Sequence, residues 1–140
     1  MTLTLADAQT IIRTALAKAT ELRLKPLAVA VLDAGGHIIA IERQDRASTL
    51  RPEIAIAKAS GALGLGVSSR AIADMATTRA PFVAAASALA PRGLVPSPGG
   101  VIIVDAAGVA IGAVGASGDT GDNDEVCVLA GLQAVGLRAQ

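Results

Sequence analysis

The hydrophobic positions near the N-terminus recur at helical spacing. Over residues 5–22 the apolar side chains fall on one face of a 3.6-residue repeat. Thr4 stands directly before this run and Asp7 follows three residues later, which is the arrangement of an N-terminal helix cap. The pattern therefore predicts a first helix over residues 5–22.

Four shorter apolar runs have the composition of β-strands. Residues 27–33 and 37–43 are rich in β-branched side chains and flank a short connection with two glycines, which is typical of a hairpin. Residues 101–105 and 109–117 form a second such pair and are apolar at nearly every position. Strands of that kind are covered on both faces. We therefore expect an antiparallel sheet between helical layers.

Two or three helices are predicted between the two hairpins. Pro52 lies where a helix accepts proline, in its first turn, and residues 53–66 continue that second helix. Ser68 or Ser69 is the predicted cap of a short helix that runs to Met75.

The last of these helices, a loop before the second hairpin and a closing helix after it complete the predicted order. Pro81 opens a helix over residues 81–90, and residues 91–100 hold three prolines and three glycines and are predicted to be a loop. Asp122 or Asn123 is predicted to cap the closing helix, which runs over residues 124–137. No linker or internal repeat divides the chain, so one domain over residues 1–140 is expected.

Composition narrows the possible partners and surroundings. The 140 residues carry 12 basic and 12 acidic side chains and a single aromatic residue, Phe82, so the electrostatic and stacking requirements of nucleic-acid binding are not met. The start MTLTLADAQ argues against a secretory signal, and no uncharged run reaches membrane-spanning length without a glycine or proline. Because Cys127 is the only cysteine, no intrachain disulfide can form, and a cytoplasmic location without membrane association is expected.

The stretch at residues 114–125, VGASGDTGDNDE, combines three glycines with four acids. It lacks the lysine of a phosphate-binding loop and the glycine spacing of a dinucleotide fold. The acids occupy the helix start where a phosphate would otherwise bind, and they do not follow the register of a calcium loop. We therefore expect no metal here, and interpret the acids as helix-capping residues or as a pocket wall that includes Asp124 or Glu125.

Other polar residues have both a structural and a functional interpretation. His37 follows two glycines at a hairpin and is either a solvent-facing turn residue or a ligand. Cys127 and Met75 are interpreted as core residues. Arg51 at the second helix start could clamp a carboxylate while Glu53 moves a proton; Lys58 is interpreted as an exposed stem or an ion-pair partner.

Several motifs together resemble the GlcG/HbpS family, also called the haem-degrading domain family and related to the PduO C-terminal domain. They are AVAVLDAGGHIIAIERQD, EIAIAKA, PSPGGV, AIGAVGASG and DNDEVC-x-x-AG, and they extend over roughly residues 5–137. The resemblance implies a profilin-like three-layer α/β/α sandwich, an α/β (α+β) fold around an antiparallel sheet of about five strands. It also implies a homo-oligomer, an octamer or another dimer-based assembly. Arg51 and the run at residues 43–47 depart from the pattern usual in the family.

Three functions follow from the residues and the resemblance. The first is binding of a small ligand, with haem or another tetrapyrrole as the implied cofactor. The second is a cofactor-free lyase, isomerase or hydratase that acts on a small carboxylated or aromatic metabolite, and the third is an oligomeric scaffold without a small ligand. The candidate catalytic residues are Glu53, Asp124 and Glu125. The candidate ligand-binding residues are His37, Arg51, Lys58, Phe82, Pro98, Gly99 and Gly100.

Overall fold

The computed structural model describes residues 1–140 and contains five helices and five strands. In chain order they are α1 (Leu5–Glu21), β1 (Ala28–Asp33), β2 (Ile38–Arg43), α2 (Arg51–Leu65), α3 (Ser69–Thr78), α4 (Ala80–Leu89), β3 (Gly100–Val104), β4 (Ala110–Ser117), α5 (Gly121–Ala134) and β5 (Arg138–Ala139). The strands form one sheet in the order β2-β1-β4-β3-β5, with every neighbouring pair antiparallel.

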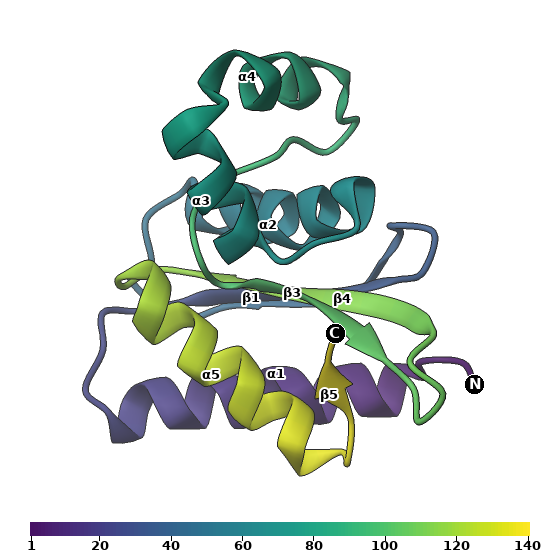
Figure 1. The fold of residues 1–140 in the computed structure, drawn as a ribbon. Helices are drawn as coiled ribbons and strands as arrows, with labels where there is room; N and C mark the ends of the chain where they lie inside the picture. Colours follow the sequence, from purple (N-terminus) through teal and green to yellow (C-terminus); the bar gives the residue numbers. More distant parts are fainter.

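The sheet is the middle layer of the molecule. Helices α1 and α5 cover one face, α2 covers the other, and α3 and α4 lie beyond α2 (Figure 1). Strand β1 shows the alternation that this arrangement requires. Val29 and Val31 join the large core beneath α1 and α5, whereas Ala28 and Ala30 pack against Ala55 of α2. The expected α/β/α sandwich around an antiparallel sheet is confirmed.

A pair of glycines brings α2 unusually close to the sheet. Gly100 of β3 and Gly115 of β4 are directly opposite each other across the ladder. A Cβ added at Gly100 would overlap the Lys58 carbonyl oxygen, and one added at Gly115 would overlap the Ala55 carbonyl oxygen. Because neither residue has a side chain, the backbone of α2 packs directly on these two glycines, which we call the glycine seat.

The helix boundaries agree with the sequence pattern at the start of the chain and differ at its end. Thr4 and Asp7 form the predicted reciprocal capping box, with each side chain accepting a hydrogen bond from the other's backbone N–H. Ser68 is the cap of α3, which extends to Thr78 and thus beyond the predicted end. Helix α5 stops at Ala134, because Gly136 turns the chain with a φ of 69° into the short strand β5, which the sequence did not predict.

The predicted cap of the last helix is corrected by the structure. The helix begins at Gly121, and the side chain of Thr120, not of Asp122 or Asn123, accepts the hydrogen bond from the Asn123 backbone N–H at 3.2 Å. Asp122 is an exposed residue of the first turn and forms an ion pair with Arg70. The acids of this helix therefore lie after its cap.

Replacing Thr120 by alanine is expected to lower the free energy of unfolding by about 1 kcal/mol, because a helix N–H loses its acceptor. Urea unfolding curves of the two proteins measure the difference. Asp122→Ala is the matched control and is expected to cost less than about 1 kcal/mol, since it removes only an exposed ion pair. A larger loss for Asp122→Ala than for Thr120→Ala would contradict this assignment.

None of the five helices combines the length and the apolar character needed to cross a lipid bilayer.

Candidate functional site

The loop at residues 96–100 and the start of α5 meet over a buried ion pair. Lys58 Nζ lies 3.1 Å from Asp124 Oδ2 and donates a second hydrogen bond to the Ala116 carbonyl oxygen at 3.0 Å. The other carboxylate oxygen, Asp124 Oδ1, accepts from the Asp119 backbone N–H at 3.0 Å. Lys58 is only 3% exposed and Asp124 only 1%. The interpretation of Lys58 as an exposed stem is therefore wrong, and its interpretation as an ion-pair partner is right.

The pair is poorly solvated. Burial lowers the pKa of the Lys58 ammonium against the opposing effect of Asp124, and burial raises the pKa of the Asp124 carboxyl against the opposing effect of Lys58. In both groups loss of water therefore outweighs the attraction between the partners. The pair is therefore costly to bury, and loss of either partner would leave the other charge buried alone.

The loop at residues 96–100 closes directly over this pair. A Cβ added at Gly99, whose φ is +127°, would lie 2.9 Å from Lys58 Nζ and 2.8 Å from the Ala116 carbonyl oxygen. Pro98 is packed so tightly on Gly121 that a Cβ there would lie 2.8 Å from Pro98 Cδ. The predicted ligand-binding residues Pro98, Gly99 and Gly100 thus surround the ion pair and the glycine seat.

Arg51 and Glu53, two further residues of the predicted enzyme site, make no hydrogen bond or ion pair with Asp124. Arg51 is half-buried, and its guanidinium donates to Ser117 Oγ at 3.2 Å and to Ser48 Oγ at 3.1 Å. Glu53 is exposed. The hypothesis of a cofactor-free enzyme built on Arg51, Glu53, Asp124 and Glu125 stays a prediction.

Glu125 takes part in a second charged cluster, centred on Arg70 of α3. Arg70 Nε donates to Glu125 Oε2 at 3.1 Å, and Arg70 Nη2 bonds to Asp122. The hydrogen bonds to Glu125 and then Asp122 raise the pKa of the guanidinium. Sequence reasoning missed Arg70 because 52 and 55 residues separate it from its partners.

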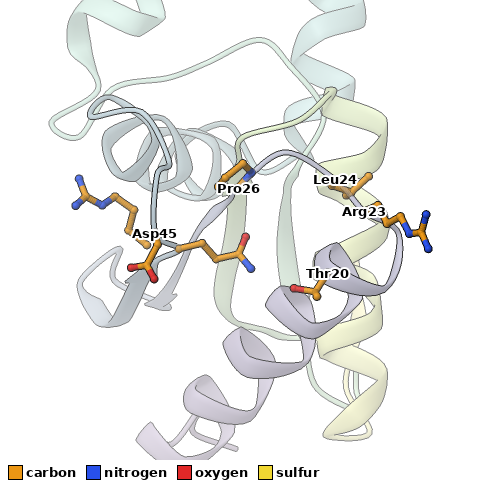
Figure 2. Close-up of a pocket in the computed structure, with 7 residues that line it drawn as sticks. Thr20, Arg23, Leu24, Pro26 and Asp45 are labelled. Atoms are coloured by element: carbon orange, nitrogen blue, oxygen red, sulfur yellow. The ribbon is translucent and has the colours of Figure 1, made fainter.

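The largest cleft, about 690 Å³, lies between the end of α1 and the end of β2. It is lined by Thr20, Arg23, Leu24, Pro26, Arg43, Gln44 and Asp45. Figure 2 shows Arg23 and Asp45 on opposite sides, with the Arg23 side chain directed away from Asp45. Gln44 Oε1 accepts from the Leu27 backbone N–H at 2.8 Å, so this side chain links the end of β2 to the start of β1. The cleft offers one apolar side chain and does not suit an apolar ligand.

A second cleft, of about 490 Å³, contains the only histidine of the chain; we call it the His37 cleft. It lies between the β1–β2 turn, the second half of α2 and the segment that follows α4. Its walls are Ala34, Gly35, Gly36, His37, Ser60, Leu63, Gly64, Ala90, Pro91 and Arg92. Sequence reasoning selected His37 but missed Arg92 and Gly64.

The β1–β2 turn fixes the position of His37. Asp33 Oδ1 accepts hydrogen bonds from the backbone N–H groups of Gly35, at 3.0 Å, and His37, at 2.9 Å. The imidazole lies against Gly35, where an added Cβ would be 3.1 Å from His37 Cδ2. The ring is exposed to solvent on a backbone that is held rigidly.

An apolar cleft of about 300 Å³ adjoins the His37 cleft and shares Gly64, Ala90 and Pro91 with it. We call it the α2–α4 cleft; its remaining walls are Gly61, Leu65, Ala86, Leu89 and Leu94. Leu89 is 84% exposed, the highest exposed fraction among the large apolar side chains left at the surface. The two clefts together offer an imidazole at one end and a hydrocarbon surface at the other.

The other side chains that bind haem iron in proteins lie away from these clefts. Cys127 is fully buried, as predicted, and burial together with the Asp124 carboxylate raises the pKa of its thiol to about 11. Met75 packs against the small core between α3 and α4, as expected. Phe82 is 41% exposed, with the Arg79 guanidinium 4.4 Å from its ring centroid. No three His, Cys, Asp or Glu side chains converge in a way that could hold a metal ion.

Comparisons with known proteins agree with this fold. The model of the family described as haem degrading protein HbpS-like matches residues 3–133. The crystal structure of HbpS is similar to this one, with 26% sequence identity between the two chains and a TM-score of 0.83. The superposition covers 97% of this chain and 92% of the HbpS chain. The crystal structure of an HbpS double mutant from Streptomyces reticuli shares 27% sequence identity with this chain and has a TM-score of 0.83. That match covers 97% of this chain and 88% of the mutant chain.

A third solved structure, the PduOC:heme complex, has a TM-score of 0.89 and covers 100% of this chain and 99% of that one. Its sequence identity is 24%, so this likeness concerns the fold alone. No curated protein matches the sequence.

Proposed function

The chain belongs to the HbpS-like family of haem-degrading proteins, and from this premise we propose that it binds haem or a related tetrapyrrole in the His37 cleft. The observation that carries the proposal is the position of the only imidazole of the chain at a cleft that continues into an apolar surface. A binder of this kind serves in haem sensing, storage or protection. Assembly into a homo-oligomer, as the family resemblance implies, is part of the proposal.

The residues of the cleft fit the chemistry of haem. The exposed His37 imidazole, on a turn that Asp33 holds in place, would bind the haem iron. Leu63, Ala90 and Pro91 supply apolar contact for the macrocycle, and Arg92 supplies a positive charge for its carboxylates. When bound, haem would supply a redox-active iron centre to this site.

Wild-type protein titrated with haemin is expected to develop a sharp Soret band that saturates at one haem per chain or per dimer. The His37→Ala variant is expected to lose that band and to bind at least about tenfold more weakly, because no other exposed side chain of the cleft ligates iron. Added free imidazole is expected to restore the spectrum of the variant.

Two results would decide against the proposal. One is a wild-type protein whose haemin spectrum equals that of haemin in buffer. The other is a His37→Ala variant with the same Soret band and affinity as the wild type. Cys127→Ala is the matched control and is expected to leave the haemin spectrum unchanged, because its thiol is buried in the core.

A further inference from the structure

We infer that the His37 cleft orients its ligand, with carboxylates at Arg92 and a hydrocarbon edge that crosses Gly64 into the α2–α4 cleft. The inference rests on the proposed function and deepens it, because it assigns the residues that orient the ligand: a flat amphipathic molecule with its carboxylates on one edge. Protoporphyrin has this form, since its two propionates share one edge of the ring.

Arg92 is a positive charge without a partner. Its side chain is exposed at the wall of the His37 cleft, and it makes no ion pair and no side-chain hydrogen bond. It is also the only arginine or lysine in the wall of that cleft. A free guanidinium presents two parallel N–H donors that match a carboxylate. Arg92 therefore marks the end of the cleft at which a ligand's carboxylates would bind.

Gly64 is a glycine that nothing in the protein requires. It is the penultimate residue of α2, where glycine is still less favourable than alanine, and a Cβ built on it would meet no atom within 4 Å. Gly61, one turn earlier, is different, because a Cβ there would lie 3.1 Å from the Leu94 Cα. The space in front of Gly64 belongs to both clefts. A bare stretch of helix backbone at that point lets the flat face of a ligand lie directly on α2.

The polarity of the walls changes across Gly64. His37, Ser60 and Arg92 line only the His37 cleft, whereas Leu65, Leu89 and Leu94 line only the α2–α4 cleft. Leu89 is otherwise left almost wholly in water. A hydrocarbon edge placed there would cover Leu89, which stabilises the complex through burial of apolar surface on both partners.

The first test compares haemin with its dimethyl ester, which keeps the ring and the iron but carries no carboxylates. Wild-type protein is expected to bind haemin at least about tenfold more tightly than the ester, as a charge-assisted hydrogen bond warrants. Arg92→Gln is expected to weaken haemin binding to the level of the ester and to leave ester binding unchanged. Arg13→Gln, an exposed arginine on α1, is the matched control and is expected to bind both ligands like the wild type.

Equal loss of both ligands in Arg92→Gln, or no loss of either, would overturn the orientation. If the wild type binds neither ligand, the proposed function itself fails, and this outcome is distinguishable because it appears before any variant is compared. The two results therefore separate failure of the inference from failure of its premise.

The second test fills the space in front of Gly64. Gly64→Leu is expected to weaken haemin binding at least about tenfold, because a leucine there occupies the floor of both clefts, while the melting temperature stays the same or rises. Ala84→Leu on the exposed surface of α4 is the matched control and is expected to bind haemin normally. Unchanged haemin affinity in Gly64→Leu would overturn the inference.

Sedimentation of the same proteins, and of Leu89→Gln, tests whether a second copy of the chain occupies the α2–α4 cleft. The expected result is an unchanged particle mass in each variant and a weaker affinity for haemin in Leu89→Gln. A changed mass with unchanged haemin affinity would assign the cleft to a contact between subunits and would overturn the inference.

Discussion

Replacement of Lys58 by methionine is expected to lower the free energy of unfolding by about 3–5 kcal/mol, because it leaves the Asp124 carboxylate buried without its positive partner. Asp124→Leu is expected to cost a similar amount by stranding the Lys58 ammonium. Denaturant unfolding of the variants measures both losses. Arg70→Met on α3 is the matched control, since it breaks two ion pairs near the surface with the same helix α5, and it is expected to cost about 1 kcal/mol or less.

The double variant Lys58→Met/Asp124→Leu is expected to recover most of the stability that either single variant loses. Burial lowers the pKa of Lys58 and raises that of Asp124, and both shifts favour the neutral forms. The intact ion pair therefore stabilises the fold little more than apolar side chains of similar size would. A double-mutant cycle separates this coupling from the loss of each side chain. If Lys58→Met were no more damaging than Arg70→Met, the pair would not support the fold in the way described.

This experiment also bears on function. Asp124 was a candidate catalytic residue, but the structure places its carboxylate between Lys58 and the Asp119 backbone N–H. If its role is structural, the folded double variant should bind haemin as the wild type does. The His37 cleft does not include either partner.

Periodicity predicted most of the fold because it records burial within each element. The first helix, both hairpins and the loop at residues 91–100 follow from hydrophobic spacing and from glycine and proline, which act over a few residues. The two errors at the last helix have local causes. Gly121 and Asp122 are residue types common before a helix, but here they are its first two residues. The sequence therefore did not indicate Thr120 as the cap. Strand β5 has only two residues, too few for a period-two pattern.

The candidate site was harder to predict because it depends on contacts between distant segments. Lys58 has two interpretations in the sequence, an exposed stem or an ion-pair partner, because lysine is almost never buried without a partner. The sequence does not decide between them, since the partner Asp124 lies 66 residues later. The role of Arg92 depends on the β1–β2 turn, which approaches the segment after α4 only in the folded chain. One local signal did exist: a glycine inside a helix costs stability, so Gly64 could have drawn attention to the cleft in front of it.

Gly115→Val is expected to be among the most damaging single substitutions in this protein. The new Cβ would overlap the Ala55 carbonyl oxygen and lie 3.0 Å from the Ala59 backbone nitrogen, so α2 would have to move off the sheet. Overpacking against backbone atoms, which cannot change rotamer, is expected to cost about 3 kcal/mol or more, and part of the protein is expected to become insoluble. Unfolding midpoints and the soluble fraction after expression measure this effect.

Gly118→Val is expected to act in the same way, because its Cβ would overlap the Pro26 carbonyl oxygen before β1. Gly64→Ala is the matched control: it is also a glycine substitution, but it faces open space inside a helix and is expected to stabilise the protein by about 0.5–1 kcal/mol. A soluble Gly118→Val variant with an unchanged unfolding midpoint would show that the segment before β1 can shift away from β4. If Gly115→Val gave soluble protein with an unchanged unfolding midpoint, the sheet would tolerate a wider spacing from α2. The position of Lys58 beneath Gly99, and with it the buried ion pair, would then need another explanation than the glycine seat.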